Sequence, residues 1–281
     1  MPTNILFGLF VSLGVALNAQ DFTGSATYKT SSKMSITLDS TSMASGMQEE
    51  LNAMLKKMSK KEYILNFNKS ESLWKEVESL GGPSTSGGGA IIMNVSSGGG
   101  ELYKNTKEKN YAQSKSLFGK PFLVQDDLKE SEWKLESDTK QIGQYTCYKA
   151  TFTREVEHRT FTSENSDDEK KSEDITEKKT QTITAWYTPQ IPVNHGPENY
   201  WGLPGLILEV SNGNRLMICS KVVINPKEVV EIVAPKKGKK VNSEEYKALM
   251  MEKMEEMNKM YDGGRKKGDG EHRSISIKIG G

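Results

Sequence analysis

The sequence has few of the residues from which catalytic and metal sites are usually built. It contains three histidines and two cysteines, and no HExxH, GxSxG or CxxC pattern is present. An enzyme needs a nucleophile with a base, paired carboxylates or metal ligands within reach of one another. The sequence therefore predicts a protein without catalytic activity, and it indicates neither a cofactor nor a metal centre.

The sequence also lacks an excess of charge of either sign. Lysine and arginine total 38, aspartate and glutamate total 37, and the formal net charge is +1. Proteins that bind nucleic acid usually carry a strong positive charge. The one dense basic run, 236–240, has no aromatic partners nearby that would stack on bases. Nucleic acid is therefore excluded as a predicted partner.

Long apolar runs are absent outside the N-terminus. The run from Ile5 to Leu17 is followed by small residues and a plausible cleavage site after Gln20, and it is shorter than the roughly 20 residues of a membrane-spanning helix. This pattern predicts a signal peptide over 1–20, the alternative being a buried N-terminal helix. We expect the mature chain to have no transmembrane helix and to be exported to the periplasm, the outer membrane or the extracellular space.

Cysteine usage leaves two interpretations open. Cys147 and Cys219 each lie inside a strand-like segment, without the spacing of a redox or metal pair. In an oxidising compartment they could form a disulfide if their Cα atoms come within about 7 Å. Two separately buried thiols are equally compatible with the sequence.

Alternating apolar residues predict a mainly β protein of the α+β class. The expected strands are short and separated by Gly or charged turns, which is typical of an antiparallel meander: 24–35, 63–67, 72–77, 101–106, 111–114, 122–125, 133–136, 144–152, 182–187, 206–210 and 215–224, with 227–234 and the Ile275–Ile279 alternation as further candidates. Methionine-rich stripes at helical spacing predict two amphipathic helices, 43–58 and 242–261.

Two segments have compositions that disfavour a packed core. Residues 80–100 are rich in Gly and Ser, and 157–180 are almost wholly charged and hydroxylic. Both are predicted to be flexible inserts in a single domain spanning 21–261. A Gly- and Lys-rich tail, 262–281, follows this domain.

Four prolines interrupt the strand pattern between Tyr187 and Leu206. Each lacks an N–H group and fixes its own φ, so this stretch is predicted to be a long shaped loop. Its aromatic side chains either plug one end of the sheet or contact a ligand. We expect Trp186, Tyr200 and Trp201 to gather around one end of the sheet. His195, beside Glu198, is either a turn-stabilising residue or part of a site.

The string WYTPQIPVNHGPENYWGLPGLILEV resembles the GLPGLI family of Bacteroidetes envelope proteins, which is named after the hexapeptide found here at 202–207. The resemblance extends to FLVQDDL, Trp133, the segment 139–150 and the methionine-rich C-terminal helix. It implies an envelope location but no assigned activity and no catalytic residue. The family-motif and candidate binding residues are Trp186, Tyr187, Pro189, Pro192, His195, Gly196, Pro197, Tyr200, Gly202, Leu203, Pro204, Gly205, Leu206 and Ile207.

The expected order of elements also resembles the half-barrel of outer-membrane lipoprotein carriers, a curved antiparallel sheet covered by helices. We therefore expect a lipid or extended apolar partner in a groove lined by adaptable methionines. One alternative is a scaffold that contacts an outer-membrane protein partner through the 186–206 loop. Another is a Cu(I)-handling protein, because thioethers are ligands that Cu(I) prefers; the candidates are Met250, Met254 and Met257 with Met43, Met47, Met54 and Met58.

Overall fold

The computed structural model describes residues 22–32, 37–38, 60–77, 100–164, 171–228, 230–264 and 275–276. Four expectations lie wholly or largely outside these residues: the signal peptide over 1–20, the helix over 43–58, the Gly- and Ser-rich segment 80–100 and the Gly- and Lys-rich tail 262–281.

One open, mixed sheet of twelve strands dominates the fold, in the order β13-β7-β6-β5-β4-β3-β1-β12-β11-β10-β9-β8. Two meanders flank the first strand. The bounds are β1 (Gly24–Ser32), β3 (Lys61–Phe67), β4 (Glu71–Glu76), β5 (Leu102–Asn105), β6 (Asn110–Leu117), β7 (Lys120–Asp127), β8 (Lys134–Ile142), β9 (Tyr145–Glu164), β10 (Lys171–Thr188), β11 (Leu206–Ser211), β12 (Arg215–Ile224) and β13 (Lys239–Val241). Strands β7 and β13 pair in parallel, and the other neighbours in this sheet pair antiparallel.

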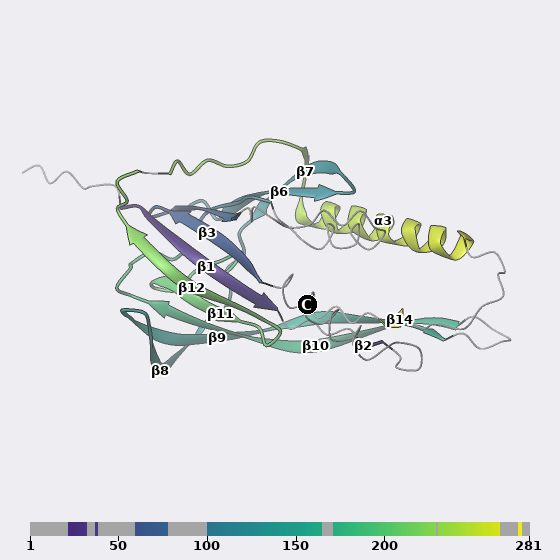
Figure 1. Ribbon diagram of the computed structural model, residues 1–281, viewed down its shortest axis with the longest axis horizontal. Helices are drawn as coiled ribbons and strands as arrows, with labels where there is room; N and C mark the ends of the chain where they lie inside the picture. Colours follow the sequence, from purple (N-terminus) through teal and green to yellow (C-terminus); the bar gives the residue numbers. More distant parts are fainter. Residues whose placement is uncertain are drawn as a thin grey trace, which may run out of the picture.

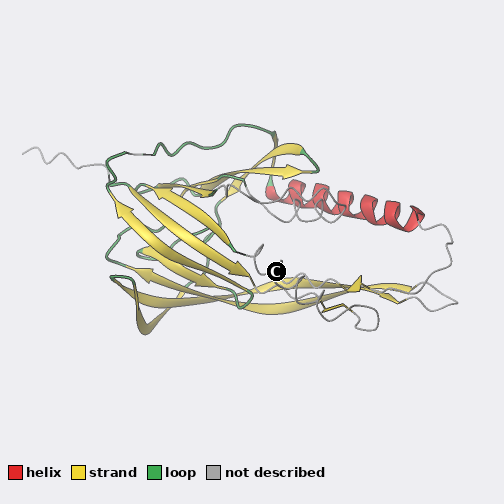
Figure 2. Ribbon diagram, viewed as in Figure 1, coloured by secondary structure: helices red, strands yellow, loops and turns green. Residues whose placement is uncertain are grey.

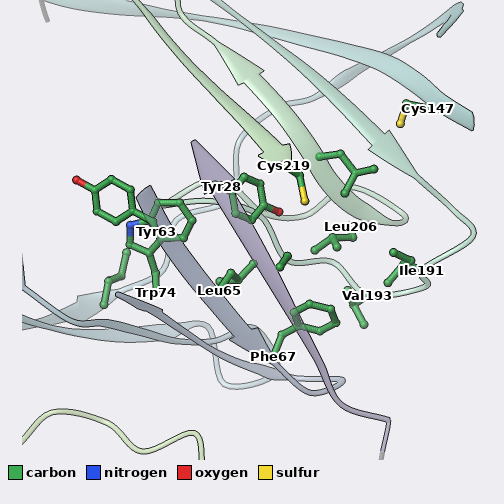
Figure 3. Packing of buried hydrophobic residues seen from close by; sticks show 13 residues of the cluster. Tyr28, Tyr63, Leu65, Phe67, Trp74, Cys147, Ile191, Val193, Leu206 and Cys219 are labelled. Atoms are coloured by element: carbon green, nitrogen blue, oxygen red, sulfur yellow. The ribbon is translucent and has the colours of Figure 1, made fainter. Parts of the chain in front are cut away.

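The sheet is curved (Figure 1), and its main hydrophobic cluster draws side chains from both meanders. Side chains from both meanders reach this cluster, including Leu65 and Phe67 from β3 and Cys147 from β9. In Figure 3, Tyr28, Leu65 and Phe67 face the residues Ile191, Val193 and Leu206 across the interior. The alternation of buried and less buried residues along β1 and β3 produces this inner face, since successive strand residues point to opposite sides.

Strands β9 and β10 form a two-stranded arm that the sequence analysis did not predict. They pair with each other from Tyr148–Tyr187 out to Glu164–Lys171, whereas the predicted flexible insert covered 157–180. That prediction is wrong for the described residues of this range. A paired backbone satisfies its own hydrogen bonds without a buried core, and the register sets lysine opposite glutamate at Lys178–Glu157. Figure 2 shows the arm extending away from the rest of the sheet.

One helix, α3 (Ser243–Gly264), is present in the described part of the chain. Its N-terminus has the predicted capping box, because the Asn242 side chain accepts from the Glu245 N–H at 2.8 Å and the Glu245 carboxylate accepts from the Asn242 N–H at 3.0 Å. Tyr246 packs against Phe122 of β7. The described residues contain no helix long and apolar enough to cross a membrane.

One further sequence prediction differs from the structure, and another lies partly outside the described residues. No strand is assigned among the described residues of 227–234, where Pro226 and Pro235 bound the segment. Of the isoleucine alternation near the C-terminus, only Ile275–Ser276 is described, and it forms a short strand, β14, which pairs with β2 (Thr37–Leu38) in a separate two-stranded sheet.

Candidate functional site

The loop between β10 and β11, residues 189–205, is held by its own backbone hydrogen bonds. Leu206 N donates to Ile191 O and Ile207 N donates to His195 O, both at 3.0 Å. Within the loop, Gly202 N donates to Asn194 O at 2.9 Å and Gly205 N donates to Leu203 O at 2.8 Å. The prolines cannot donate, so these bonds replace a strand ladder with a specific folded path.

The loop contributes side chains to two hydrophobic clusters. Ile191 and Val193 belong to the main cluster on the inner face. Tyr200 and Leu203 belong to a second cluster together with Tyr187 of β10. The apolar residues of the loop are therefore part of the core in two places.

Two tryptophans join the loop to the connection between β7 and β8. The Trp201 indole N–H donates to the carbonyl of Lys129 at 3.0 Å, and the Trp133 indole N–H donates to the carbonyl of Trp201 at 2.8 Å. Trp133 also packs edge-on against Phe152 at 4.6 Å between ring centroids. Both indole donors are satisfied, as buried tryptophans require.

Lys104, from β5, is the buried cation of the loop. Its side chain is 0% exposed, and its ammonium donates to three loop carbonyls, those of Gly196 at 2.7 Å, Glu198 at 2.5 Å and Tyr200 at 3.4 Å. Burial lowers the pKa of Lys104 to about 7, and the Glu198 carboxylate opposes this shift. The three N–H donors of an ammonium match the three carbonyls, so Lys104 holds the turn at 196–200 in place.

Glu198 occupies the tip of this turn in a strained backbone conformation. Its φ is +49°, in the left-handed region that non-glycine residues seldom adopt. Its carboxylate pairs with the guanidinium of Arg215 at 2.5 Å. The backbone carbonyl of Glu198 accepts from Lys104 and its carboxylate pairs with Arg215. These two contacts hold the backbone and the side chain and maintain the strained conformation.

His195 is fully buried beside the lysine. Its Nε2 lies 3.1 Å from the carbonyl of Asn68, so Nε2 carries the proton and donates. Its Nδ1 is buried without a hydrogen-bond partner. Burial, followed by the nearby Lys104 charge, lowers the pKa of His195 to about 3. The imidazole is thus neutral at ordinary pH and acts as a donor within the core.

This lowered pKa predicts acid sensitivity. Between pH 6.5 and pH 3 the unfolded chain binds a proton at His195 that the folded chain does not, so the unfolding free energy falls as the pH falls, by up to about 1.4 kcal/mol per pH unit. We expect denaturant titrations from pH 6.5 down to about pH 5 to show this slope. The His195→Gln variant keeps a donor but does not titrate, and it should have a flatter profile. An equal slope in the variant would assign the effect to other groups.

The two cysteines are free and separately buried. Cys147 lies on β9 and Cys219 on β12, with β10 and β11 between them, which places their Cα atoms farther apart than the roughly 7 Å that a disulfide allows. Figure 3 shows both at the main cluster. Burial raises the pKa of Cys147 to about 11 and that of Cys219 to about 12, so both thiols are protonated and unreactive.

The structure brings most of the predicted loop residues into contact with the core. The buried ones are Tyr187, His195, Gly196, Pro197, Tyr200, Leu203, Gly205, Leu206 and Ile207; Pro189, Pro192, Gly202 and Pro204 are exposed. Trp186 is partly buried against the main cluster, where the Lys140 ammonium lies 4.4 Å from its ring centroid. Tyr200 packs in the second cluster, so Trp186 and Tyr200 do not gather at one place as the sequence suggested.

Sequence reasoning missed Lys104, which donates hydrogen bonds to three loop carbonyls. The sequence gives only a weak indication that Lys104 is buried. Lys104 follows Leu102 by two residues in a short strand, so both side chains lie on the inner face. A lysine at an apolar position of a strand is rarely fully buried without partners. Nothing local in the sequence shows that its partners lie more than ninety residues away.

The polar groups of this arrangement hold the loop in place. The N–H groups of Lys104 are used by carbonyls, and His195 is sealed in the core. Within the described residues, no group of three or more His, Cys, Asp or Glu side chains is placed to hold a metal ion.

Residues 133–209 match the family model Porph_ging, whose description is "protein of unknown function". The matched segment includes Trp133, strands β8, β9 and β10 and the whole loop, so the match covers the part of the chain in which the loop is built. No curated protein matches the sequence.

Among solved structures, the chain is similar to PNGF-II in space groups C2 and P21. The identities are 17% and 18%, and the TM-score is 0.46 in both cases. The alignment covers 82% of this chain and 33% of the other, so the chain spans about a third of the length of PNGF-II.

Proposed function

We propose that the chain is a non-catalytic, exported envelope protein of the GLPGLI type that binds a lipid or an extended apolar partner along α3. The intact hexapeptide at 202–207 supports the family assignment. The burial of Lys104 and His195, both 0% exposed, supports binding over catalysis, because neither side chain is open to a substrate.

The inner face of the sheet, where a half-barrel groove was expected from the sequence, is filled by the protein itself. Ile191 and Val193 from the loop pack there against residues of β1 and β3. The proposed partner is therefore placed outside this core, on the helix.

The proposal rests on the apolar side chains of α3, which are buried by the sheet at the start of the helix and exposed to solvent two turns later. Tyr246, in the first turn of the helix, is 9% exposed and packs with Leu117 and Phe122. Met250 packs at the margin of the same cluster. One turn later Met254 is 42% exposed. Methionine side chains adapt to varied apolar partners, which suits a binding surface of this kind.

Native mass spectrometry of the chain from Asp21 onward tests this proposal. We expect an apolar molecule whose mass is lost on denaturation. The Met254→Glu variant should lower the bound fraction at least about tenfold, because a carboxylate is costly to desolvate against an apolar ligand. The matched control is Leu135→Glu, at an apolar side chain on β8 that is 56% exposed, which should leave binding unchanged.

A mass spectrum without bound ligand would contradict the proposal and favour the scaffold alternative. The sequence predicted the 186–206 loop as the scaffold contact, but most of that loop is buried, and the β9–β10 arm offers a more accessible surface. Past Thr151 and Thr184, β9 and β10 pair with no third strand in the described residues, and such unpaired strand edges can add a strand from another protein. A bound copper ion would instead favour Cu(I) handling by the methionines.

A further inference from the structure

The tip of the β6–β7 hairpin presents an aromatic side chain in an unusual backbone conformation. The turn consists of Phe118, with φ 50°, and Gly119, with φ 77°, between the paired residues Leu117 and Lys120. Positive φ at both central positions is typical of a type I′ turn, for which Asn-Gly is preferred and a bulky residue is strained. The Phe118 side chain is 36% exposed, so burial in the core does not offset the strain.

Five lysines lie beside this turn. Lys120 begins β7, and the other four flank Gly238 at the start of β13: Lys236, Lys237, Lys239 and Lys240. Because β13 runs parallel to β7, with Lys239 opposite Phe122, the residues that precede β13 lead back toward the turn. A Cβ at position 238 would meet the Phe122 carbonyl carbon at 2.6 Å, so the basic segment lies directly against β7.

These lysines are available for an anionic partner. All five are exposed, and the salt bridges of the described residues include none of them. The helix next to them does not add positive charge, since Glu252, Glu255 and Glu256 are exposed on it and Lys253 pairs with Glu256. The positive patch is therefore confined to the turn and the β13 edge, which is why the overall net charge does not reveal it.

We propose that this tip, formed by Phe118, Lys120 and the four lysines around Gly238, docks the protein on the surface of a bilayer that contains anionic phospholipid. The phenyl ring would enter the interface while the ammonium groups contact lipid phosphates. One exposed aromatic ring among lysines suits a flat anionic surface, whereas a stable protein interface buries about 800 Å² per partner around an apolar centre. The docking surface lies at the hairpin and β13 and does not depend on a ligand at α3.

Vesicle co-sedimentation of the full mature chain tests the proposal. We expect binding to vesicles of phosphatidylethanolamine with phosphatidylglycerol, weak binding to phosphatidylcholine alone, and loss of binding at high salt. The double variant Lys239→Glu/Lys240→Glu should bind at least about thirtyfold more weakly, given the usual contribution of each lysine near an anionic surface. The matched control, Lys29→Glu/Lys221→Glu, reverses two exposed lysines on β1 and β12 and should bind like the wild type.

The Phe118→Asn variant separates docking from folding. It creates an Asn-Gly turn, so we expect a higher melting temperature together with about tenfold weaker vesicle binding. Equal binding to neutral vesicles, or full binding by the lysine double variant, would overturn the proposal. Wild-type affinity in Phe118→Asn with loss in the lysine variant would also overturn it, in favour of a general polyanion site. Bound ligand in the mass spectrum reports separately on α3.

Discussion

Replacing Lys104 with methionine should lower the unfolding free energy by about 3 kcal/mol or more, because the loop carbonyls that accept from its ammonium would be left buried and unpaired. Methionine has a similar length and restores the apolar character of the inner face, so lost packing would not explain the effect. Urea denaturation at neutral pH measures it, and we expect the midpoint to fall with little change in slope.

A second lysine provides the matched control for this variant. Lys115 of β6 is half-buried, and its ammonium lies 5.0 Å from the ring centroid of Tyr246 without a hydrogen-bonded carbonyl. Lys115→Met should cost no more than about 1 kcal/mol, the scale of a cation–π contact. An equal decrease in unfolding free energy in the two variants would show that the hydrogen bonds from Lys104 to the loop do not govern stability.

Replacing Gly205 with alanine is expected to cost about 3 kcal/mol or more, because the added methyl group has no space. A Cβ at this position would lie 2.2 Å from the Thr188 carbonyl oxygen and 2.5 Å from its carbon. Both are backbone atoms at the end of β10, and they cannot move without disturbing the strand. The second glycine of the hexapeptide is therefore required by the close crossing of the loop over the strand from which it starts.

The first glycine of the hexapeptide is the control. Gly202 has φ +94°, but the nearest atom to an added Cβ is Trp133 Cδ1 at 3.9 Å. Gly202→Ala should therefore cost only the backbone strain, about 1 kcal/mol. Thermal denaturation of both variants tests the difference. A larger decrease in melting temperature for Gly202→Ala than for Gly205→Ala would contradict the role of the close approach between the loop and β10.

Local sequence patterns predicted those parts of the fold that local physics determines. Strand β12 has the bounds predicted from its alternation, Arg215–Ile224, and the predicted turn before it contains Gly213 with φ 87°, a conformation that favours glycine. The capping box of α3 was likewise readable from Asn242 and Glu245. The prolines identified the 189–205 loop because they exclude a ladder.

Features that depend on distant partners could not be predicted in this way. The outer part of β9 and β10 is charged, and its strand structure arises from pairing between the two segments. The burial of Lys104 depends on carbonyls of the 196–200 turn. Trp186 and Tyr200 pack in different hydrophobic clusters, and the composition of the loop does not encode this separation.

The central position of β1 has a consequence for how the chain can fold during synthesis. This first strand pairs with β3 on one side and with β12 on the other, where Gly24 lies opposite Ile224. When the chain is synthesised from its N-terminus, β1 and β3 to β7 can assemble early, but the second edge of β1 has no partner until β12 has been made. An open edge beside Ala26 and Tyr28 is a template for mispairing between chains. The topology therefore favours a chain that is kept unfolded until it is nearly complete, and it makes premature termination upstream of β12 a direct route to aggregation.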